Sequence, residues 1–404
     1  MPRVSYLTAH EAASTLDISL ATLYAYVSRG LIRSEAMGKT RTRRYRQEDV
    51  QALKERQAQR KDPQKVAASA LRWGTPVLES ALCLIADGHF YYRGQEALTL
   101  AATHTAERVA WLIWTGEVAE PPALPAGPRL SSRWQAARRA MGQLSPYEAF
   151  QVLLPLAAID DLAAYDLRPP VVAQTGLRLL RLLAAIAVGG VPSDLGMAET
   201  LQRGWVPDDP QATACLNTAL ILCADHEFNV SAFTARCVAS AGATPYAVVS
   251  AGLAALQGAK HGGQCARVEA LLHEARTPQG ARAALASRLR RGETIPGFGH
   301  RLYPNGDPRG AALLRLATEV RPTAPAIALA SAMAQAALEL IGEQPTIDFG
   351  LVILAQALGL PPGGAIALFA MGRTIGWLGH AIEEYQQGRL IRPRAQYVGK
   401  LPAT

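Results

Sequence analysis

Residues 130–260 form the longest part of this chain with one regular pattern, and that pattern is helical. The segments from Tyr147 to Ala158 and from Val171 to Val188 are apolar at the spacing of one helix face. Pro169-Pro170 and Gly189-Gly190 bound the second segment, as expected for helix ends. No alternation of polar and apolar residues extends over any length here, so the pattern predicts a helical body.

The composition agrees with a well-packed helical protein. The chain has 404 residues, which corresponds to two or three domains of ordinary size. Hydrophobic residues make up 49% and aromatic residues only 6%, a balance typical of helical cores rich in Ala and Leu. A very apolar stretch, Phe349 to Gly372, is split by Pro361-Pro362-Gly363-Gly364 into halves too short to span a membrane. We expect two buried helices joined by a turn there, and no contact with a membrane.

The cysteines point to a reducing compartment. Five of them are scattered without a C-x-x-C pair, at positions 83, 215, 223, 237 and 265. This arrangement predicts free thiols and no structural zinc. The N-terminus also lacks the apolar core of a signal peptide. We therefore expect a cytoplasmic protein with no metal site.

Residues 1–65 carry most of the excess positive charge. They hold 13 Lys and Arg against 7 Asp and Glu, a net charge of +6 out of +8 for the whole chain. Thr8 followed by Glu11 predicts the start of a short helix. Ser19 can cap a second helix that ends at Gly30, and residues 38–46 predict a basic two-stranded wing. Helix, tight turn and helix is a plan that places its second helix in the major groove of DNA.

The same residues resemble the winged helix-turn-helix of the MerR and excisionase type. The resemblance rests on the segments 21–32, 43–45 and 49–50. It implies DNA contacts from the second helix and the wing, at Thr22, Tyr24, Arg29, Arg41, Arg43, Arg44 and Arg46. Arginine contacts with phosphate would make such binding depend on salt. The alternatives are a small domain with a solvated basic face, or a module for protein interaction or assembly.

A Pro- and Gly-rich turn from Ile295 to Tyr303 is the first candidate for chemistry. It contains His300, which can donate a proton near neutral pH. Arg309 follows nine residues later and can grip a carboxylate with two hydrogen bonds. On these residues alone, an anion site with an acid and a basic surface turn are both open.

Further polar residues lie in apolar helical surroundings, where charges are rare unless they are paired or functional. Asp348 precedes the very apolar stretch, so it is a candidate base with a raised pKa and also a candidate helix N-cap, and both can hold. His226 lies in the segment 223–231 and is either functional or a satisfied core histidine near a helix end. His261 precedes two glycines that allow close approach of a ligand, and Arg373 must meet an anion or a partner.

Together these residues supply one carboxylate, three imidazoles and several arginines. The set suits abstraction of a proton beside a carbonyl, with histidines stabilising the enol. The arginines suit a dicarboxylate or tricarboxylate ligand. No Walker or dinucleotide-binding glycine pattern occurs in the sequence, and this chemistry requires no metal cluster.

From about residue 75 to 400 the chain resembles citrate synthase and its relative 2-methylcitrate synthase. The motifs that carry the resemblance are 92–94, 224–229, 261–263, 297–301 with 307–309, 348–349, 373 with 376–377, and 391–395 with 397–399. The resemblance implies an all-α citrate synthase fold with large and small helical domains, a cleft that closes between them, and a homodimer. The small winged helix-turn-helix domain precedes this fold. The expected boundaries are 1–62 for the DNA-binding domain, 63–72 for a linker, 73–262 with 370–404 for the large domain, and 263–369 for the small domain.

The resemblance also implies roles for single residues. Asp348 resembles the base that removes a methyl proton from acetyl-CoA, His261 the group that hydrogen-bonds the thioester oxygen, and His300 the acid at the oxaloacetate carbonyl. The carboxylate-binding residues are His226, Arg309, Arg373 and, from the partner subunit, Arg392. The backbone of Pro296, Gly297, Phe298 and Gly299 resembles part of the CoA adenine site. Acetyl-CoA and CoA are then substrate and product, and no cofactor is bound permanently.

Several residues depart from the family pattern around this site. They are Cys223, Thr346, the segment 350–352 and the segment 264–266. These changes put the substrate and the rate in question more than the class of reaction. They also motivate a second hypothesis, a DNA-binding regulator in which a citrate synthase body senses a metabolite or a CoA ester.

Overall fold

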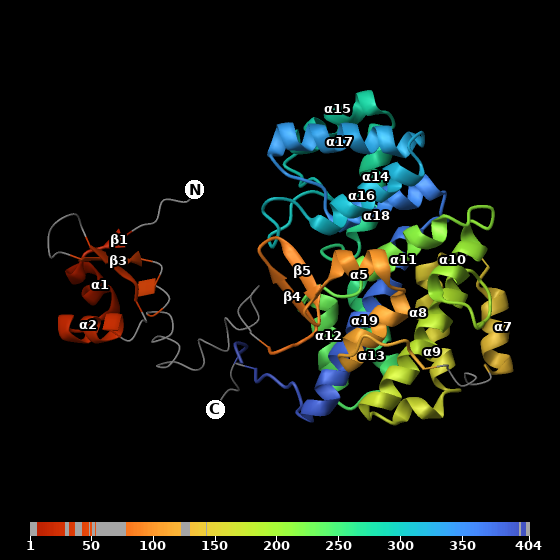
Figure 1. The fold of residues 1–404 in the computed structure, drawn as a ribbon, viewed down its shortest axis with the longest axis horizontal. Helices are drawn as coiled ribbons and strands as arrows, with labels where there is room; N and C mark the ends of the chain where they lie inside the picture. The colour runs from red at the N-terminus through yellow and green to blue at the C-terminus, as the bar shows by residue number, and fades with distance from the viewer. Residues whose placement is uncertain are drawn as a thin grey trace. The chain divides into compact units, whose positions relative to one another are not determined.

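The computed structural model describes residues 6–28, 32–36, 43–47, 49–50, 53, 78–122, 130–142, 144–395 and 397–400. The chain forms two compact units, one of Ser80–Ile391 and one of Met1–Glu79 with Arg392–Thr404 (Figure 1). The expected linker at 63–72, the expected helix end at Gly30 and the predicted DNA contacts Arg29 and Arg41 lie outside the described residues. The domain boundaries given above stay predictions.

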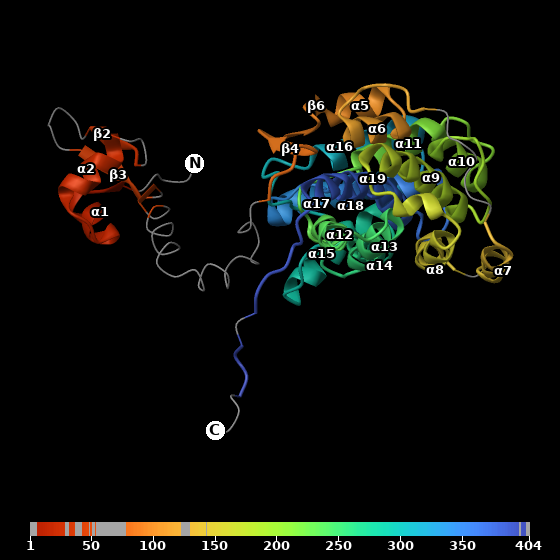
Figure 2. The same cartoon turned by 90° about the horizontal axis from the view of Figure 1, so that it is seen from below.

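The described part of the smaller unit combines helices with a small sheet, and Figure 2 shows α1 and α2 beside strands β2 and β3. Its elements are β1 (Tyr6–Leu7), α1 (Ala9–Leu16), α2 (Leu20–Ser28), β2 (Ser34–Ala36) and β3 (Arg43–Arg46), and the antiparallel sheet has the order β1-β3-β2. Thr8 and Glu11 form the predicted capping box of α1, and Ser19 Oγ accepts a hydrogen bond from the Thr22 N–H at the start of α2. A separate core contains Leu16, Leu23, Ile32, Tyr45 and Val50. The predicted helix-turn-helix is confirmed. Of the predicted wing at 38–46, β3 forms as a strand, but its partner β2 lies before that range, and residues 37–42 lie outside the described residues.

The larger unit opens with a small antiparallel sheet, β4 (Cys83–Ala86), β5 (His89–Tyr92) and β6 (Gln95–Glu96). Helices make up most of the rest of its described part. They are α5 (Ala97–Thr103), α6 (Ala106–Thr115), α7 (Ser132–Ala140), α8 (Pro146–Ala158), η1 (Leu162–Tyr165), α9 (Pro169–Ala187), α10 (Met197–Trp205), α11 (Ala212–Leu222), α12 (Val230–Ser240), α13 (Pro245–Leu256), α14 (Gln264–Ala275), η2 (Pro278–Gly280), α15 (Ala281–Arg290), α16 (Pro308–Val320), α17 (Pro325–Ile341), α18 (Ile347–Leu358) and α19 (Gly364–Gln387). Helices α14 to α18 gather at the top of the view in Figure 1.

The apolar stretch before residue 372 behaves as predicted, because α18 ends at Leu358 and α19 begins at Gly364. Within the residues that the structure describes, two helices, α9 and α19, are long and apolar enough to cross a membrane by length and composition. In the folded unit 72% of the apolar window of α9 and 94% of that of α19 are buried inside the protein. Both therefore serve as core helices here.

Helix α19 brings the loop after α11 into place. At Gly376 an added Cβ would overlap the carbonyl oxygen of Ala224, and at Gly372 it would overlap that of Leu220. The Gly376 N–H donates to that Ala224 oxygen at 2.9 Å. These close approaches need glycine, and they hold the segment 223–229 against the middle of a buried helix.

Candidate active site

Arg373 lies in the middle of α19 and is 1% exposed. Its Nε donates to the Cys223 carbonyl oxygen at 2.7 Å, and the guanidinium lies over the Phe369 ring at 4.7 Å. Burial lowers the pKa of Arg373, although Asp225 opposes that effect. Within the described ranges no carboxylate lies within ion-pair distance of this guanidinium. A buried cation without a counter-ion is a strong indication of an anion site.

His226, His300 and Tyr303 pack together beside that cation. The rings of His226 and His300 are 5.1 Å apart, and His226 Nε2 is 3.0 Å from the Tyr303 hydroxyl. Burial, with Arg309 and Arg373, lowers the pKa of His226 well below its ordinary value. Burial and Arg309 lower the pKa of His300 to about 4, against the opposing effect of Asp307. Both rings are therefore neutral at physiological pH.

The neutral His300 ring has a defined tautomer. Its Nδ1 accepts a hydrogen bond from the Leu302 backbone N–H at 3.2 Å. A nitrogen that accepts cannot carry the proton, so the proton lies on Nε2. His300 can therefore donate a hydrogen bond from Nε2 to a ligand oxygen.

Arg309 differs from Arg373 because it has a counter-ion. It is 1% exposed at the start of α16, and its Nε and Nη2 bind both carboxylate oxygens of Asp307 at 2.9 and 2.8 Å. Burial alone would raise the pKa of Asp307, but Arg309 outweighs it and holds that pKa below its ordinary value. Asp307 also accepts the Ile347 N–H at 3.0 Å, which ties this pair to the start of α18.

Asp348 is the second residue of α18 and is partly buried. Burial raises the pKa of its carboxyl to about 6, although Arg309 and a hydrogen bond from Cys265 oppose that shift. The Cys265 Sγ lies 3.6 Å from Asp348 Oδ1. The alternative of a helix N-cap is wrong, because Thr346 holds that position. The other alternative, a base with a raised pKa, agrees with the structure.

His261 lies just before α14, and burial and Arg373 lower its pKa to about 4. Its Nε2 is 2.7 Å from the Ser231 hydroxyl, which also accepts from the Trp377 indole N–H at 3.1 Å. Sequence reasoning did not single out Ser231 or Trp377 as supports of this histidine. The only signal for Ser231 is its place five residues after His226, at the start of α12.

The turn from Ile295 to Phe298 is buried, so the alternative of a basic surface turn is wrong for this part. The Gly299 N–H donates to the Gln344 carbonyl at 3.0 Å, and the Thr346 N–H donates to the Gly297 carbonyl at 2.8 Å. An added Cβ at Gly297, where φ is +81°, would overlap Val268. Two of the backbone groups expected to contact CoA are thus already used to hold the turn against the start of α18.

Most of the predicted residues influence one another electrostatically. Arg309 acts electrostatically on His226, His300 and Asp348, and Arg373 acts on His226 and His261. Arg392 belongs to the other unit, where its side chain is exposed, and its role as the partner's arginine stays a prediction. Among the described residues no group of three or more metal-ligating side chains could hold a metal ion.

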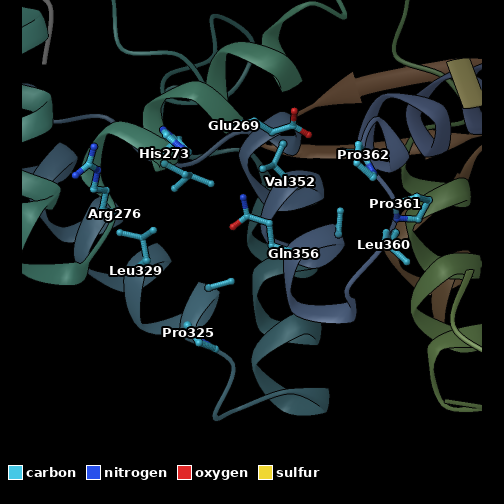
Figure 3. A pocket seen from close by; sticks show the side chains of 14 residues that line it. Glu269, His273, Arg276, Pro325, Leu329, Val352, Gln356, Leu360, Pro361 and Pro362 are labelled. Carbon is cyan, nitrogen blue, oxygen red and sulfur yellow. The ribbon is translucent and has the colours of Figure 1, made fainter. Parts of the chain in front are cut away.

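A cavity of about 640 Å³ is lined by a different set of residues, most of which Figure 3 labels. The middle and C-terminal parts of α14 and α18 line it, with Glu269 and His273 on α14, Arg276 just after α14, and Val352 and Gln356 on α18. The other walls come from the start of α17 and the turn before α19. None of the predicted site residues lines this cavity.

In the smaller unit the predicted DNA contacts differ in exposure. Tyr24 on α2 is 52% exposed, Thr22 is partly buried at the capped start of that helix, and Arg43 is exposed. Arg44 and Arg46 both pair with Glu35, at 3.2 and 3.3 Å. Tyr24 and Arg43 are therefore the better placed of these residues to meet an external partner.

Comparison with known proteins agrees with both parts of the chain. Residues 70–394 match the family described as citrate synthase, C-terminal domain, and residues 6–58 match a helix-turn-helix domain. The 2-methylcitrate synthase of Mycobacterium tuberculosis is 32% identical over 341 residues, which cover 76% of this chain and 84% of that protein. Citrate synthase 2 of Bacillus subtilis is 33% identical over 211 residues, covering 51% of this chain and 57% of that protein. The chain thus spans little more than half the length of the first curated relatives it matches.

The fold also matches solved structures. A ternary complex of citrate synthase from Thermoplasma acidophilum with carboxymethyl coenzyme A and oxaloacetate superimposes with a TM-score of 0.71 and 24% identity. The match covers 82% of this chain and 96% of that one. The expected all-α citrate synthase fold behind a helix-turn-helix domain is confirmed. The chain belongs to the citrate synthase family.

Proposed function

We propose that this protein is a citrate synthase-type enzyme, which condenses acetyl-CoA or another short acyl-CoA with oxaloacetate and releases CoA. The observation that carries the proposal is Asp348, a partly buried carboxylate whose pKa is raised to about 6. A base of that strength is ionised at neutral pH and still binds a proton readily. It shares the electrostatic field of Arg309 with two neutral histidines, His226 and His300.

The chemistry follows from the state of each group. Asp348 takes a proton from the carbon next to the thioester, and an N–H of His261 donates to the thioester oxygen as the enol forms. The Ser231 hydroxyl donates to Asn229 Oδ1 at 2.8 Å, so at His261 it acts as the acceptor and the ring carries its proton on Nε2. This N–H has to turn from Ser231 to the thioester oxygen. The enol carbon attacks the carbonyl carbon of the 2-oxo acid, whose developing oxyanion accepts a hydrogen bond from the Nε2–H of the neutral His300. The proton that Asp348 removed balances the charge when it passes to that oxygen through His300 or solvent. Water then hydrolyses the thioester and releases CoA.

The buried arginines are proposed to bind the two carboxylates of oxaloacetate. Arg373 has no counter-ion within the described ranges and is ready to receive one carboxylate. Arg309 is already paired with Asp307, so a substrate carboxylate has to share that guanidinium or rotate it. His226 can hydrogen-bond the same ligand. Arg392 from a partner subunit would complete the site.

A homodimer agrees with the exposed apolar side chains of the larger unit. Ile159, Leu162 and Tyr165 are 60%, 79% and 69% exposed, and all three lie at or just after the end of α8. A cluster of this kind is a usual mark of a protein interface. We propose a dimer that buries this surface in a cytoplasmic enzyme. A monomeric mass in solution would contradict the dimer.

Thiol release tests the activity. Purified protein with oxaloacetate and either acetyl-CoA or propionyl-CoA should release CoA, and the faster substrate identifies the preferred acyl chain. Asp348→Ala should lower the rate by about 10²-fold to 10⁴-fold, because it removes the general base. Asp194→Ala is the matched control, since Asp194 is an exposed carboxylate outside the site. No release with any pair from a folded protein that binds oxaloacetate would overturn the proposal.

A second candidate is a DNA-binding regulator, which the helix-turn-helix match at residues 6–58 favours. At low salt the protein should bind duplex DNA, and affinity should fall as salt rises. Arg43→Ala should reduce the slope of that salt dependence by about one. Arg282→Ala serves as the control, because Arg282 is an exposed arginine of the larger unit. Absence of tight binding to genomic or random duplex at low salt would exclude this role.

A further inference from the structure

Helices α14 and α18 meet at their first turns and enclose a cavity further along. At the first turns the Cys265 Sγ is 3.6 Å from Asp348 Oδ1, a normal distance for a thiol hydrogen bond. At the other ends the cavity of Figure 3 is lined by His273 of α14 and Gln356 of α18. The thiol is thus a side-chain contact between the two helices at the end that carries the proposed base.

The Cys265 thiol can act only as a donor in this contact. The side chain is 1% exposed, and burial together with the Asp348 charge raises its pKa well above the ordinary value. The sulfur therefore keeps its proton, and a carboxylate can accept it. Cys265 is the one side chain in the described part of the chain that hydrogen-bonds to Asp348. The other oxygen, Oδ2, has no such partner there.

We propose that Cys265 is a positioning residue for the base: its S–H binds Oδ1 of Asp348, fixes the carboxylate plane, and leaves Oδ2 to take the substrate proton. The role of Asp348 as the base rests on the function proposed above, whereas the thiol contact does not. A carboxylate held at one oxygen loses one rotation, which favours the geometry for proton transfer. The contact also favours the ionised form, which is the form that acts as a base.

The other groups around Asp348 do not replace this contact. Arg309 at the start of α16 favours the carboxylate, and its partner Asp307 disfavours it. On α19, Arg373 acts on Cys223, which in turn is affected by the Asp348 charge. On α17, Glu339 is exposed and pairs with Arg282. The backbone N–H of Asp348 also favours its ionised carboxylate, and the charged groups act through space, while Cys265 is the side chain that hydrogen-bonds one defined oxygen.

Two substitutions separate a hydrogen bond from simple packing. Cys265→Ala removes the donor, and Cys265→Ser keeps a donor of similar size. The acid limb of kcat/KM should lie near pH 6 in the wild type and move up by about half to one pH unit in the alanine variant. The serine variant should stay at or below the wild-type position. Cys215→Ala is the matched control, since Cys215 is fully buried on α11 and should leave the profile unchanged.

A direct titration keeps the test independent of turnover. The carboxyl signal of Asp348, followed by carbon-13 NMR on labelled protein and assigned with Asp348→Asn, should titrate at higher pH in Cys265→Ala than in wild type. If wild type releases no thiol but this shift occurs, the contact stands and the synthase proposal fails. Equal titration and equal pH profiles in wild type and Cys265→Ala would overturn the inference. So would equal losses of kcat in both Cys265 variants without any pH shift.

Discussion

Asp348→Asn is expected to lower thiol release by about 10²-fold to 10⁴-fold and to stabilise the folded protein at neutral pH. The first effect follows because asparagine cannot accept the substrate proton. The second follows from the raised pKa of the Asp348 carboxyl, about 6 in the folded protein against an ordinary value near 3.8. Ionisation of this group is harder in the folded protein than in the unfolded chain, so the charge opposes folding.

The stability gained by Asp348→Asn should depend on pH. Because the folded pKa is the higher one, the folded state binds the proton more tightly between about pH 4 and pH 6. The wild-type penalty therefore grows as pH rises through that window and is complete above pH 6. Part of the carboxyl reaches solvent, so we expect a gain of about 1–2 kcal/mol for Asp348→Asn at pH 7. Most of the gain should be lost by pH 4, where the folded carboxyl is protonated and the unfolded one is about half ionised, and the rest should disappear near pH 3.

Denaturant unfolding at pH 7 and pH 4, at one protein concentration, measures this gain. Asp194→Asn is the control, because Asp194 is exposed and its nearest basic group, Arg181, is 3.7 Å away. That substitution should change stability by less than about 0.5 kcal/mol at either pH. A loss of stability in Asp348→Asn at pH 7 would show that the carboxylate is stabilised by its surroundings. A base poised near pH 6 would then be the wrong description of this residue.

Local signals predicted the fold well. The break between α18 and α19 was predictable because Pro361 to Gly364 stop a helix whatever packs around them. The capping box of Thr8 and Glu11 was predictable because both of its hydrogen bonds join residues three apart. Helices α8 and α9 were predictable because each buries one apolar face, which leaves a periodic pattern.

Contacts between distant segments were not predictable from local patterns. Cys265 and Asp348 are 83 residues apart, and Ser231 and Trp377 are 146 apart. No local spacing brings such pairs together, because their meeting depends on how helices pack. The motifs pointed to the titratable residues themselves, while their supports had to be read from the structure. The N-cap alternative for Asp348 failed for a different, local reason, since Thr346 and Asp348 are both plausible helix starts in sequence.

Arg309→Met and Arg373→Met are expected to weaken oxaloacetate binding alike and to change stability differently. Each removes a buried guanidinium proposed to bind a substrate carboxylate, so each should lower affinity by about 10²-fold or more. Arg309 is paired with Asp307, and its loss leaves a buried carboxylate without a partner. That kind of loss costs about 3–5 kcal/mol of folding stability.

Removal of Arg373 should cost little stability, in contrast to removal of Arg309. Its removal relieves a buried cation that has no counter-ion within the described ranges, and it also breaks the hydrogen bond to the Cys223 carbonyl. These two changes oppose each other, so we expect a net change in stability within about 1 kcal/mol. Calorimetric titration with oxaloacetate and denaturant unfolding measure the two quantities on the same samples.

The double variant Asp307→Asn with Arg309→Met tests whether the Asp307–Arg309 ion pair explains why Arg309→Met loses more stability than Arg373→Met. It removes both charges, so it should recover most of the stability lost in Arg309→Met while leaving oxaloacetate binding weak. Asparagine can still accept the Ile347 N–H that Asp307 now binds. If the double variant stays as unstable as Arg309→Met, packing of the long side chain is the main contribution of Arg309 to stability. If Arg373→Met binds oxaloacetate as tightly as wild type, the unpaired guanidinium is not the anion site.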